Sequence, residues 1–383
     1  MAKSLFWIST AAIIYTYLGY PAAIWLLARL RRKNVLKSPA APRVSVVIAC
    51  HNEAGNIEAR INNLFECDYP PDRLEIILVS DGSTDLTADE ARRHASDRVR
   101  VFAYDKRMGK AAALNVGVEA ASGEVILFAD ARQRFEPGAI KELVANFADR
   151  RVGAVSGELL LDGPPGASVG EGVGLYWKYE KWIRKSESRS GSVIGATGAI
   201  YAIRRELWEP LPPMTILDDV YTPMRIALRG RRVVFEEKAR AHDMTTDSAA
   251  REFSRKVRTL MGNYQLCQLM PRLLIPTSGL LFQFYSHKLM RLAAPVFLLI
   301  LLVTNALLVG SPRGGAGVFY EVSFAAQLLF YASVLAGGYL LKRKRKVRLL
   351  NFAYVFSVMN AAALVGLVYF ILGKRNVWVR VKS

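Results

Sequence analysis

The chain has 383 residues, of which 52% are hydrophobic and 22% charged, and 52 Lys and Arg against 33 Asp and Glu give a formal net charge of +19. This composition excludes a disordered chain and a collagen-like fibre, and the three cysteines have no CxxC spacing that would indicate a zinc site or a disulfide framework. A basic surplus of this size is typical of proteins that meet nucleic acid, an anionic membrane surface or phosphorylated substrates.

The first predicted element is an apolar helix over residues 5–28, which contain no charged side chain. A helix needs about 20 residues to cross a hydrocarbon core of about 30 Å, so this segment is long enough to span a membrane. A cleaved signal peptide is the alternative, but its apolar region would be only about 7–15 residues long. Because a basic cluster from Arg29 to Lys33 follows instead of a cleavage site, we expect an uncleaved anchor and basic linker over residues 1–41.

Residues 42–262 have a different pattern, which predicts a separate domain. Short β-branched runs at 44–49, 74–79 and 124–129 alternate with helical stretches, which lie at about 56–65, 84–95 and 110–121. Near-continuous apolar strands that alternate with helices indicate a mostly parallel sheet covered on both faces. We therefore expect an α/β domain that binds its ligand beyond the carboxyl ends of the strands.

The last third of the chain is again apolar. Residues 292–310, 322–341 and 349–373 lack charged side chains and are each predicted to span the membrane, which makes 292–383 a three-helix membrane region with a basic tail. The preceding region, 263–291, is apolar and aromatic but contains Pro276, Gly279, His287 and Lys288. We expect it to contain a helix that lies along the membrane surface.

The basic clusters predict the orientation in the membrane. The cluster after the first span and the run at 342–346 should both face the cytoplasm, and one span, a cytoplasmic domain and three further spans satisfy both. The same count places the C-terminal tail outside, although it carries Lys374, Arg375, Arg380 and Lys382. The side on which this tail lies stays open.

Polar residues follow each of the three predicted strands. The sequence HNE, which ends in Glu53, follows the first strand, DGS begins with Asp81 after the second, and DAR runs from Asp130 to Arg132 after the third. Each motif alone is also a common turn or helix cap. Their placement at successive strand ends, beside excess Lys and Arg, indicates a nucleotide held partly through a metal ion.

Two other nucleotide-binding arrangements are excluded by missing motifs. Arg107, Gly109 and Lys110 begin a predicted helix whose N-terminus suits a phosphate group. However, GxxxxGK[ST] is absent, which excludes a P-loop NTPase, and no GxGxxG follows the first strand, which argues against a dinucleotide-dependent dehydrogenase.

Taken in order, the strings VSVVIACHNEAGNIEARINNL, ILVSDGSTDLT, RMGKAAALNVG and ILFADARQRF resemble a family 2 glycosyltransferase. Further along, GATGAIYAIRRELW and TILDDVYTPMRIALRGRRVVF are similar to that family's acceptor-side segment and catalytic acidic motif. The flanking spans and SHKLMRLAAP resemble the membrane-integrated branch, which includes chitin, hyaluronan, cellulose and poly-N-acetylglucosamine synthases. The resemblance implies a GT-A-type, Rossmann-like sheet domain joined to transmembrane helices.

The resemblance also implies roles on the donor side. Glu53 and Asp81 would contact the uridine, and Lys110 would lie near the nucleotide. Asp130, as the first residue of the family's DxD element, would help to hold Mg²⁺ or Mn²⁺ against the diphosphate. The metal would neutralise the charge that builds up on the leaving group.

On the acceptor side, the pair Asp218 and Asp219 matches the family's acidic catalytic motif. Asp219 would be the general base that deprotonates the acceptor hydroxyl, and a neighbouring carboxylate raises its proton affinity, which suits this role. The same pair is also typical of a helix N-terminus. Attack opposite the nucleotide would invert the anomeric centre and give a β-linkage from an α-linked donor.

Two positions depart from the family pattern. Arg132 replaces the second acid of DxD, so that either a carboxylate is missing from the metal shell or Arg132 contacts phosphate directly; His242 or Asp243 could supply a ligand instead. The QxxRW motif of processive synthases is reduced to an arginine, Arg258, which could clamp the diphosphate. The missing tryptophan weakens the case for a long-chain polymerase, and whether transfer is single or processive stays open.

We therefore expect a membrane-bound inverting glycosyltransferase that uses a nucleotide sugar, a UDP-sugar by preference, and a glycan or lipid-linked acceptor in extracellular or cell-surface polysaccharide synthesis. Its expected location is a bacterial inner membrane, in contact with membrane lipid and with the catalytic domain in the cytoplasm; accessory subunits stay unknown. The alternatives are a single-sugar transferase to a lipid carrier and a non-catalytic membrane protein with a degenerate nucleotide-sugar fold. We expect no nucleic-acid partner, because the positive charge flanks the spans and no recognition motif occurs.

Overall fold

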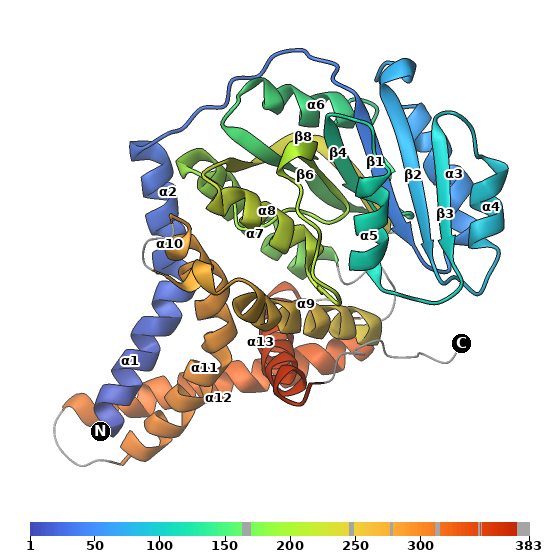
Figure 1. The fold of residues 1–383 in the computed structure, drawn as a ribbon. Helices are drawn as coiled ribbons and strands as arrows, with labels where there is room; N and C mark the ends of the chain where they lie inside the picture. The colour runs from blue at the N-terminus through green and yellow to red at the C-terminus, as the bar shows by residue number, and fades with distance from the viewer. Residues whose placement is uncertain are drawn as a thin grey trace.

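The computed structural model describes residues 1–162, 170–244, 249–275, 279–310, 315–343, 345 and 347–373. Within this part, an α/β domain lies on one side of the molecule and a group of long helices on the other (Figure 1). The basic tail from residue 374, and Lys344 and Lys346 of the basic run, lie outside the described residues.

The α/β domain is built on a mixed sheet of eight strands, in the order β3-β2-β1-β4-β7-β6-β8-β5. Strands β3, β2, β1 and β4 are parallel to one another, β7 is antiparallel to both β4 and β6, β8 is parallel to β6, and β5 is antiparallel to β8. Their bounds are β1 Val44–Cys50, β2 Leu74–Asp81, β3 Val99–Tyr104, β4 Val125–Ala129, β5 Arg134–Phe135, β6 Val152–Asp162, β7 Ile200–Arg204 and β8 Arg232–Met244. The predicted α/β fold with a mostly parallel sheet is confirmed, and β1, β2 and β4 are the three strands that the sequence predicts.

Both faces of the sheet are covered, which explains why its central strands are apolar along their whole length. On β1, Val46 and Ile48 pack against α3 and α6 on one face, whereas Val47 packs with residues of α5 on the other. The helices of this domain are α3 Ala54–Phe65, α4 Thr87–Arg93, α5 Lys110–Glu119, α6 Ala139–Ala145, α7 Gly170–Ser190, α8 Asp218–Leu228 and α9 Ala249–Leu269. Short 3-10 turns lie at Pro71–Arg73 (η2), Asn146–Ala148 (η3), Arg205–Leu207 (η4) and Pro271–Leu274 (η5).

Among the described residues, four helices are long and apolar enough to cross a membrane: Ala2–Leu30, Leu281–Leu308, Gly317–Lys342 and Arg348–Ile371. The first comprises α1 (Ala2–Ile14), η1 (Tyr15–Gly19) and α2 (Tyr20–Leu30); the second comprises α10 (Leu281–Gln283), η6 (Phe284–Leu289) and α11 (Met290–Leu308). The others are α12 (Gly315–Lys342) and α13 (Arg348–Ile371). They correspond to the four predicted spans, with boundaries that differ by up to about eleven residues.

The region 263–291 is divided differently from the sequence prediction. Its first residues belong to α9, Pro271–Leu274 is a short turn, and from Leu281 onward it forms one helix with α11. The polar residue His287 does not end that helix, because its ring is hydrogen-bonded on both sides. Whether any part of this region lies along a membrane surface stays a prediction.

A buried set of ionisable groups joins the first two long helices to α7; we call it the polar junction and define it as Tyr20, Glu180, Glu187, His287 and Arg291. The Tyr20 hydroxyl donates to Glu187 Oε1 (2.5 Å), and His287 Nδ1 lies 2.7 Å from the same oxygen. His287 Nε2 lies 3.2 Å from Glu180 Oε2, and Arg291 forms an ion pair with Glu180. Each carboxylate of the junction therefore has a cationic or hydrogen-bonding partner.

Candidate active site

The loops that follow β1 and β2 are tied together at the carboxyl edge of the sheet, where the parallel-strand rule places a ligand. His51 Nδ1 lies 2.8 Å from the Asp81 carbonyl oxygen, and the Asn52 side chain accepts a hydrogen bond from the Thr84 backbone N–H (2.8 Å). Asn52 adopts a left-handed backbone conformation, with φ of 57°. These contacts bring the two predicted motifs HNE and DGS side by side.

Asp81 is buried and holds the start of α5. Its Oδ1 accepts from the Met108 backbone N–H (2.6 Å) and its Oδ2 from that of Gly109 (2.8 Å). The next residue, Gly82, has φ of +61°, and a Cβ there would lie 2.3 Å from the Arg107 backbone nitrogen. The DGS sequence thus fixes the loop that precedes Lys110, and the predicted contact of Asp81 with uridine stays a prediction.

Glu53 lies on the same edge, at the N-cap of α3. Its backbone N–H donates to Thr87 Oγ1 (2.8 Å), and its Oε2 accepts from Asn56 Nδ2 (2.6 Å). The side chain is half-buried and keeps its other carboxylate oxygen available. Its predicted nucleotide contact remains untested.

Three carboxylates surround one ammonium group beyond β4; we call Lys110, Asp130, Asp218 and Asp219 the acidic cluster. Lys110 Nζ donates to Asp130 Oδ1 (3.0 Å) and lies 3.6 Å from Asp218 Oδ2. Burial lowers the pKa of the Lys110 ammonium, but the charges of Asp130, Asp218 and Asp219 outweigh it and raise the pKa overall. Lys110 is thus charged, and the carboxylates outnumber it.

Asp218 and Asp219 form the first turn of α8. Asp218 Oδ2 is buried and has no hydrogen-bond partner, whereas Asp219 Oδ2 accepts from the Gly198 backbone N–H (3.1 Å). A Cβ on Gly198 would lie 3.0 Å from that oxygen, so glycine allows the close approach. Burial first, and then the charge of Asp218, raise the pKa of Asp219 to about 6, which suits a general base near neutral pH.

Arg132 is held by Asp243, a residue 111 positions later in the chain. Arg132 Nη2 donates to Asp243 Oδ2 (2.9 Å), which also accepts from Gln133 Nε2 (3.1 Å). His242 Nδ1 lies 2.9 Å from Asp162 Oδ2 at the ends of β8 and β6. Both residues that the sequence suggests as substitute metal ligands, His242 and Asp243, are therefore engaged with protein partners.

Arg258 lies on α9, on the face that meets the segment before the acidic pair. Positions 258, 262 and 265 are spaced by four and three residues and so share one face of the helix. Gln265 Oε1 accepts from the Ile216 backbone N–H (2.9 Å), and a Cβ on Gly262 would contact the side chain of Leu217. This face supports the segment that leads to Asp218, and a role of Arg258 toward diphosphate stays a prediction.

Sequence reasoning did not single out Arg184 or Gln265, which position the site without belonging to a family motif. Arg184 Nη1 donates to Thr197 Oγ1 (2.8 Å) and Nη2 to Ser156 Oγ (2.6 Å), and Thr197 precedes the glycine that contacts Asp219. Arg184 could have been noticed in the sequence, because it lies in a predicted amphipathic helix beside aromatic residues. Gln265 carried no local signal, because its partner is a backbone group 49 residues away.

A divalent cation fits two of the carboxylates. Asp130 and Asp218 Oδ2, which has no hydrogen bond, face the same ammonium group, and both offer the hard oxygen atoms that Mg²⁺ and Mn²⁺ prefer. Across the described ranges, however, no group of three or more His, Cys, Asp and Glu is arranged to hold a metal by itself. Ligands from the nucleotide diphosphate would have to complete the coordination shell.

The comparisons with known proteins concern the family and the fold of the chain. Residues 45–209 match the model of glycosyl transferase family 2. The poly-beta-1,6-N-acetyl-D-glucosamine synthase of Staphylococcus aureus is 23% identical over 245 residues, which are 62% of this chain and 58% of the relative. Glycosyltransferase AglE of Haloferax volcanii is 28% identical over 220 residues, or 55% of this chain and 68% of the relative.

The fold also matches a solved structure along almost its whole length. The mannosyltransferase PcManGT from Pyrobaculum calidifontis, solved in complex with GDP-Man and Mn²⁺, has a TM-score of 0.72, with 23% identity and coverage of 97% of this chain and 99% of that chain. The match with the synthase covers less than two thirds of that relative. The chain thus carries a family 2 glycosyltransferase domain with a GT-A fold, joined to four helices of membrane-spanning length.

Proposed function

We propose that this protein is a membrane-bound glycosyltransferase that transfers a sugar from a nucleotide sugar to a hydroxyl group of a glycan or lipid-linked acceptor. The observation that carries the proposal is the acidic cluster. Lys110 lies 3.0 Å from Asp130 and 3.6 Å from Asp218, beside a half-buried Asp219, within the matched domain or directly after it. A charged ammonium and an excess of carboxylates at the carboxyl edge of a parallel sheet suit a diphosphate, a metal ion and a reacting hydroxyl.

On the donor side, Lys110 and Arg258 are the proposed cations for the diphosphate, and Asp81 keeps the loop before Lys110 in place. Asp130, with the free oxygen of Asp218, is the proposed holder of Mg²⁺ or Mn²⁺. When bound, the metal would supply positive charge against the leaving diphosphate. Glu53, at the same edge, is the proposed contact to the nucleoside.

On the acceptor side, Asp219 is the proposed general base. Its raised pKa lets it take the proton of an acceptor hydroxyl as that oxygen attacks the anomeric carbon. The hydrogen bond from the Gly198 backbone N–H holds one carboxylate oxygen, and the other can face the acceptor. Attack from this side, opposite the nucleotide, would invert the anomeric centre and give a β-linked product.

The donor is proposed to be a UDP-sugar, because the sequence motifs resemble synthases that use this class. A relative named as a poly-beta-1,6-N-acetyl-D-glucosamine synthase favours N-acetylglucosamine, and a structural neighbour with GDP-Man makes mannose the second choice. The proposed role is the synthesis of an extracellular or cell-surface polysaccharide. The proposed location is a bacterial inner membrane, with residues 42–262 in the cytoplasm as the basic clusters predict.

Radiolabelled UDP-GlcNAc, UDP-Glc, UDP-Gal and GDP-Man, each supplied to membranes that contain the protein, test the proposal. We expect one donor to yield a labelled product and D219N to lower the rate by about 10²–10⁴-fold, as loss of a general base does. The control is D89N, the same change at an exposed carboxylate that pairs only with Arg92 on its own helix. Equal rates for wild type and D219N would reject the proposal and leave a non-catalytic protein.

A further inference from the structure

A cavity of about 400 Å³ lies where the end of α8 and the end of α7 meet α10 and the chain after α2. It is separate from the acidic cluster, because the cluster is at the N-terminal end of α8 and the cavity at its C-terminal end. Eleven residues of helix put these ends about 15 Å apart.

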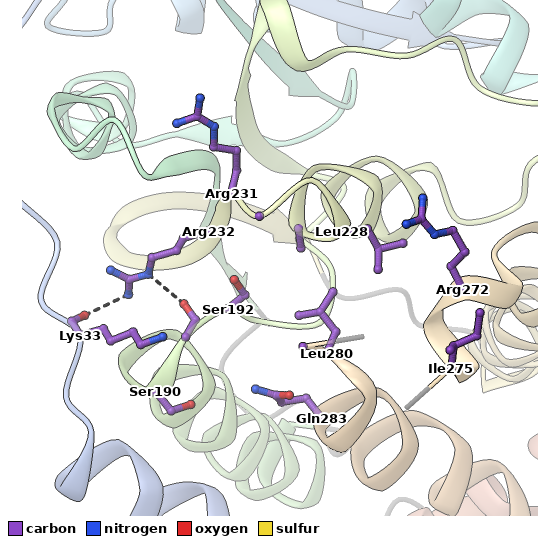
Figure 2. A pocket seen from close by; sticks show the side chains of 14 residues that line it. Lys33, Ser190, Ser192, Leu228, Arg231, Arg232, Arg272, Ile275, Leu280 and Gln283 are labelled. Atoms are coloured by element: carbon purple, nitrogen blue, oxygen red, sulfur yellow. Dashed lines mark hydrogen bonds between the residues drawn. The ribbon is translucent and has the colours of Figure 1, made fainter. Parts of the chain in front are cut away.

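The cavity is lined by four cations and no acid. They are Lys33, Arg231, Arg232 and Arg272. Figure 2 shows Lys33 and Arg232 close together on one side of the cavity and Arg272 on the other. The nearby carboxylate of Glu209 forms ion pairs with Arg225 and Arg229 instead.

The hydrogen bonds of these cations do not neutralise them. Arg232 donates to the carbonyl oxygens of Lys33, Ser188 and Gly191, and Arg231 donates to that of Arg150. Carbonyl groups satisfy the donors but leave the positive charge in place. Within the described part of the chain, none of the four cations has a carboxylate within 4.0 Å. Burial, and then the charge of Arg151, lower the pKa of Arg232 and outweigh the charge of Asp149, which raises it.

A second, independent observation points to a polar ligand. Gln283 is only 7% exposed, and its amide lines the cavity from α10, as Figure 2 shows. This amide can both donate and accept hydrogen bonds, so it offers the cavity a polar group beside the cations. The amide of Gln283 and the cations Lys33, Arg232 and Arg272 are together suited to an anion with several oxygen atoms, such as a phosphate group, whereas the Arg231 side chain points away from them in Figure 2.

The residues around the cavity favour a lipid headgroup over a free phosphate ion. The cavity lies between the end of the first long helix and the start of the second. Near the end of that first helix, Arg29 stacks on Trp25, and both residue types are typical of a membrane–water interface. Leu274, Ile275 and Phe282, next to the cavity, are 42–46% exposed. Their apolar surface suits acyl chains, as the cations suit a headgroup. We propose that this cavity binds the phosphate-bearing headgroup of an anionic membrane lipid.

The test measures the thermal unfolding midpoint of the full-length protein in neutral detergent, titrated with dioctanoyl phosphatidylglycerol, with the phosphatidylcholine of the same chain length, or with inorganic phosphate. We expect only the phosphatidylglycerol to raise the midpoint. K33Q/R272Q should weaken its apparent affinity by about tenfold or more, since hydrogen bonds to charged groups are worth about 1.5–3 kcal/mol. The matched control is K342Q/R343Q, a Lys and an Arg at the end of α12, which should respond like the wild type.

Equal effects of the two lipids, or an unchanged affinity of K33Q/R272Q, would overturn the proposal. Stabilisation by inorganic phosphate at the same concentration as phosphatidylglycerol would also overturn it, in favour of a soluble anion. If K33Q/R272Q does not fold, Q283L serves in its place, because it keeps the size of the side chain and removes the amide; we expect affinity to fall by about threefold to tenfold. The proposal does not rest on sugar transfer, so either proposal can fail alone.

Discussion

The polar junction and the acidic cluster are both groups of buried ionisable side chains, but their charges are balanced in opposite ways. In the junction, Glu187 and Glu180 each meet the ring of His287, and Glu180 also meets Arg291. In the cluster, three carboxylates share one ammonium, and Asp218 Oδ2 has no hydrogen-bond partner. In the junction every carboxylate has a partner, and these contacts hold the helices together. In the cluster the carboxylates outnumber the ammonium group, so a bound metal ion could supply the missing positive charge.

The largest expected effect is on the stability of the balanced group. E187A removes the acceptor for both the Tyr20 hydroxyl and His287 Nδ1. Removing one partner of a buried ion pair typically lowers the free energy of unfolding by about 3–5 kcal/mol. Chemical or thermal unfolding in detergent measures the change. E90A, which removes a carboxylate from surface pairs on α4, should cost less than about 1 kcal/mol, and an equal loss in both variants would contradict the distinction.

The same carboxylate predicts the pH dependence of stability. Burial raises the pKa of Glu187, but His287 and Tyr20 outweigh it and lower the pKa below that of an unfolded glutamate. Its contribution is therefore present above the unfolded pKa of about 4.3 and is lost as the pH falls. The wild type should lose more stability than E187A when unfolding is compared at pH 7 and pH 4. If the free energy of unfolding of the wild type and of E187A changed with pH in the same way, Glu187 would not be charged in the folded protein as described.

For the acidic cluster, we expect a substitution to lower activity strongly and to change stability little. D218N removes a carboxylate that repels Asp219 and whose Oδ2 has no hydrogen bond. It also removes the 3.6 Å ion pair with Lys110, but Asp130 still pairs with that ammonium group at 3.0 Å, so the free energy of unfolding should change by less than about 1 kcal/mol. Loss of a metal and donor contact should nevertheless lower kcat/KM by about 10²-fold, or about 2.7 kcal/mol of transition-state stabilisation. Steady-state kinetics and unfolding, measured on the same preparation of D218N, test this prediction. A large loss of stability with unchanged kinetics would make Asp218 a structural residue.

The pH–rate profile sharpens the assignment of Asp219. A base must be deprotonated to act, and its pKa is raised to about 6, so kcat/KM should fall about tenfold per pH unit below pH 6 and level off above it. In D218N, the neighbouring charge that raises this pKa is absent, and the acidic limb should move to lower pH. An acidic limb that stays in place in D218N would assign it to another group.

The smallest expected effect concerns His242, at the outer edge of the sheet. Burial lowers the pKa of His242, but Asp162 and Glu136 outweigh it and raise the pKa above the usual value. Its ion pairs thus contribute stability at acidic pH that is lost as the pH rises through the folded pKa. H242Q should lower the free energy of unfolding by less than about 1 kcal/mol at pH 6 and by less at pH 8.5. An effect that grows with pH would contradict the described pairs.

Sequence pattern predicted the parts of the fold that depend on local composition. The apolar strands β1, β2 and β4 and the four long helices follow from runs of side chains with a single environment. Strand β3 was missed because Arg100 interrupts its run, and β6 to β8 because they pair across long sequence distances that no local pattern reveals. How the region 263–291 is divided between α9, a short turn and the helix that begins at Leu281 could not be read from local pattern, because the partners of His287 lie about 100 residues earlier.

For the candidate site, too, the sequence predicted the residues in motifs but not the partners that lie far away in the chain. The family resemblance assigned Lys110, Asp130 and the pair Asp218 and Asp219 to one site, and the structure places Lys110 Nζ 3.0 Å from Asp130 and 3.6 Å from Asp218. The motifs did not indicate that Arg132 is paired with Asp243, nor that both oxygens of Asp81 are occupied by backbone N–H groups. Such partners depend on how distant loops pack, which a single sequence does not encode in any short pattern.

Helix α9 lies between a helix of membrane-spanning length and the segment that leads to the proposed base. One side of it lies against α13, where Gly366 leaves room for the α9 backbone, and another holds the segment before Asp218 through Gln265. The helix α13 and the segment before the proposed base are thus both in contact with α9. With α13 spanning the membrane, as proposed, these contacts would set the height of the base above the lipid. An acceptor anchored in the bilayer would have to carry its hydroxyl at that height, and the protein would choose among acceptors by length as well as by chemistry.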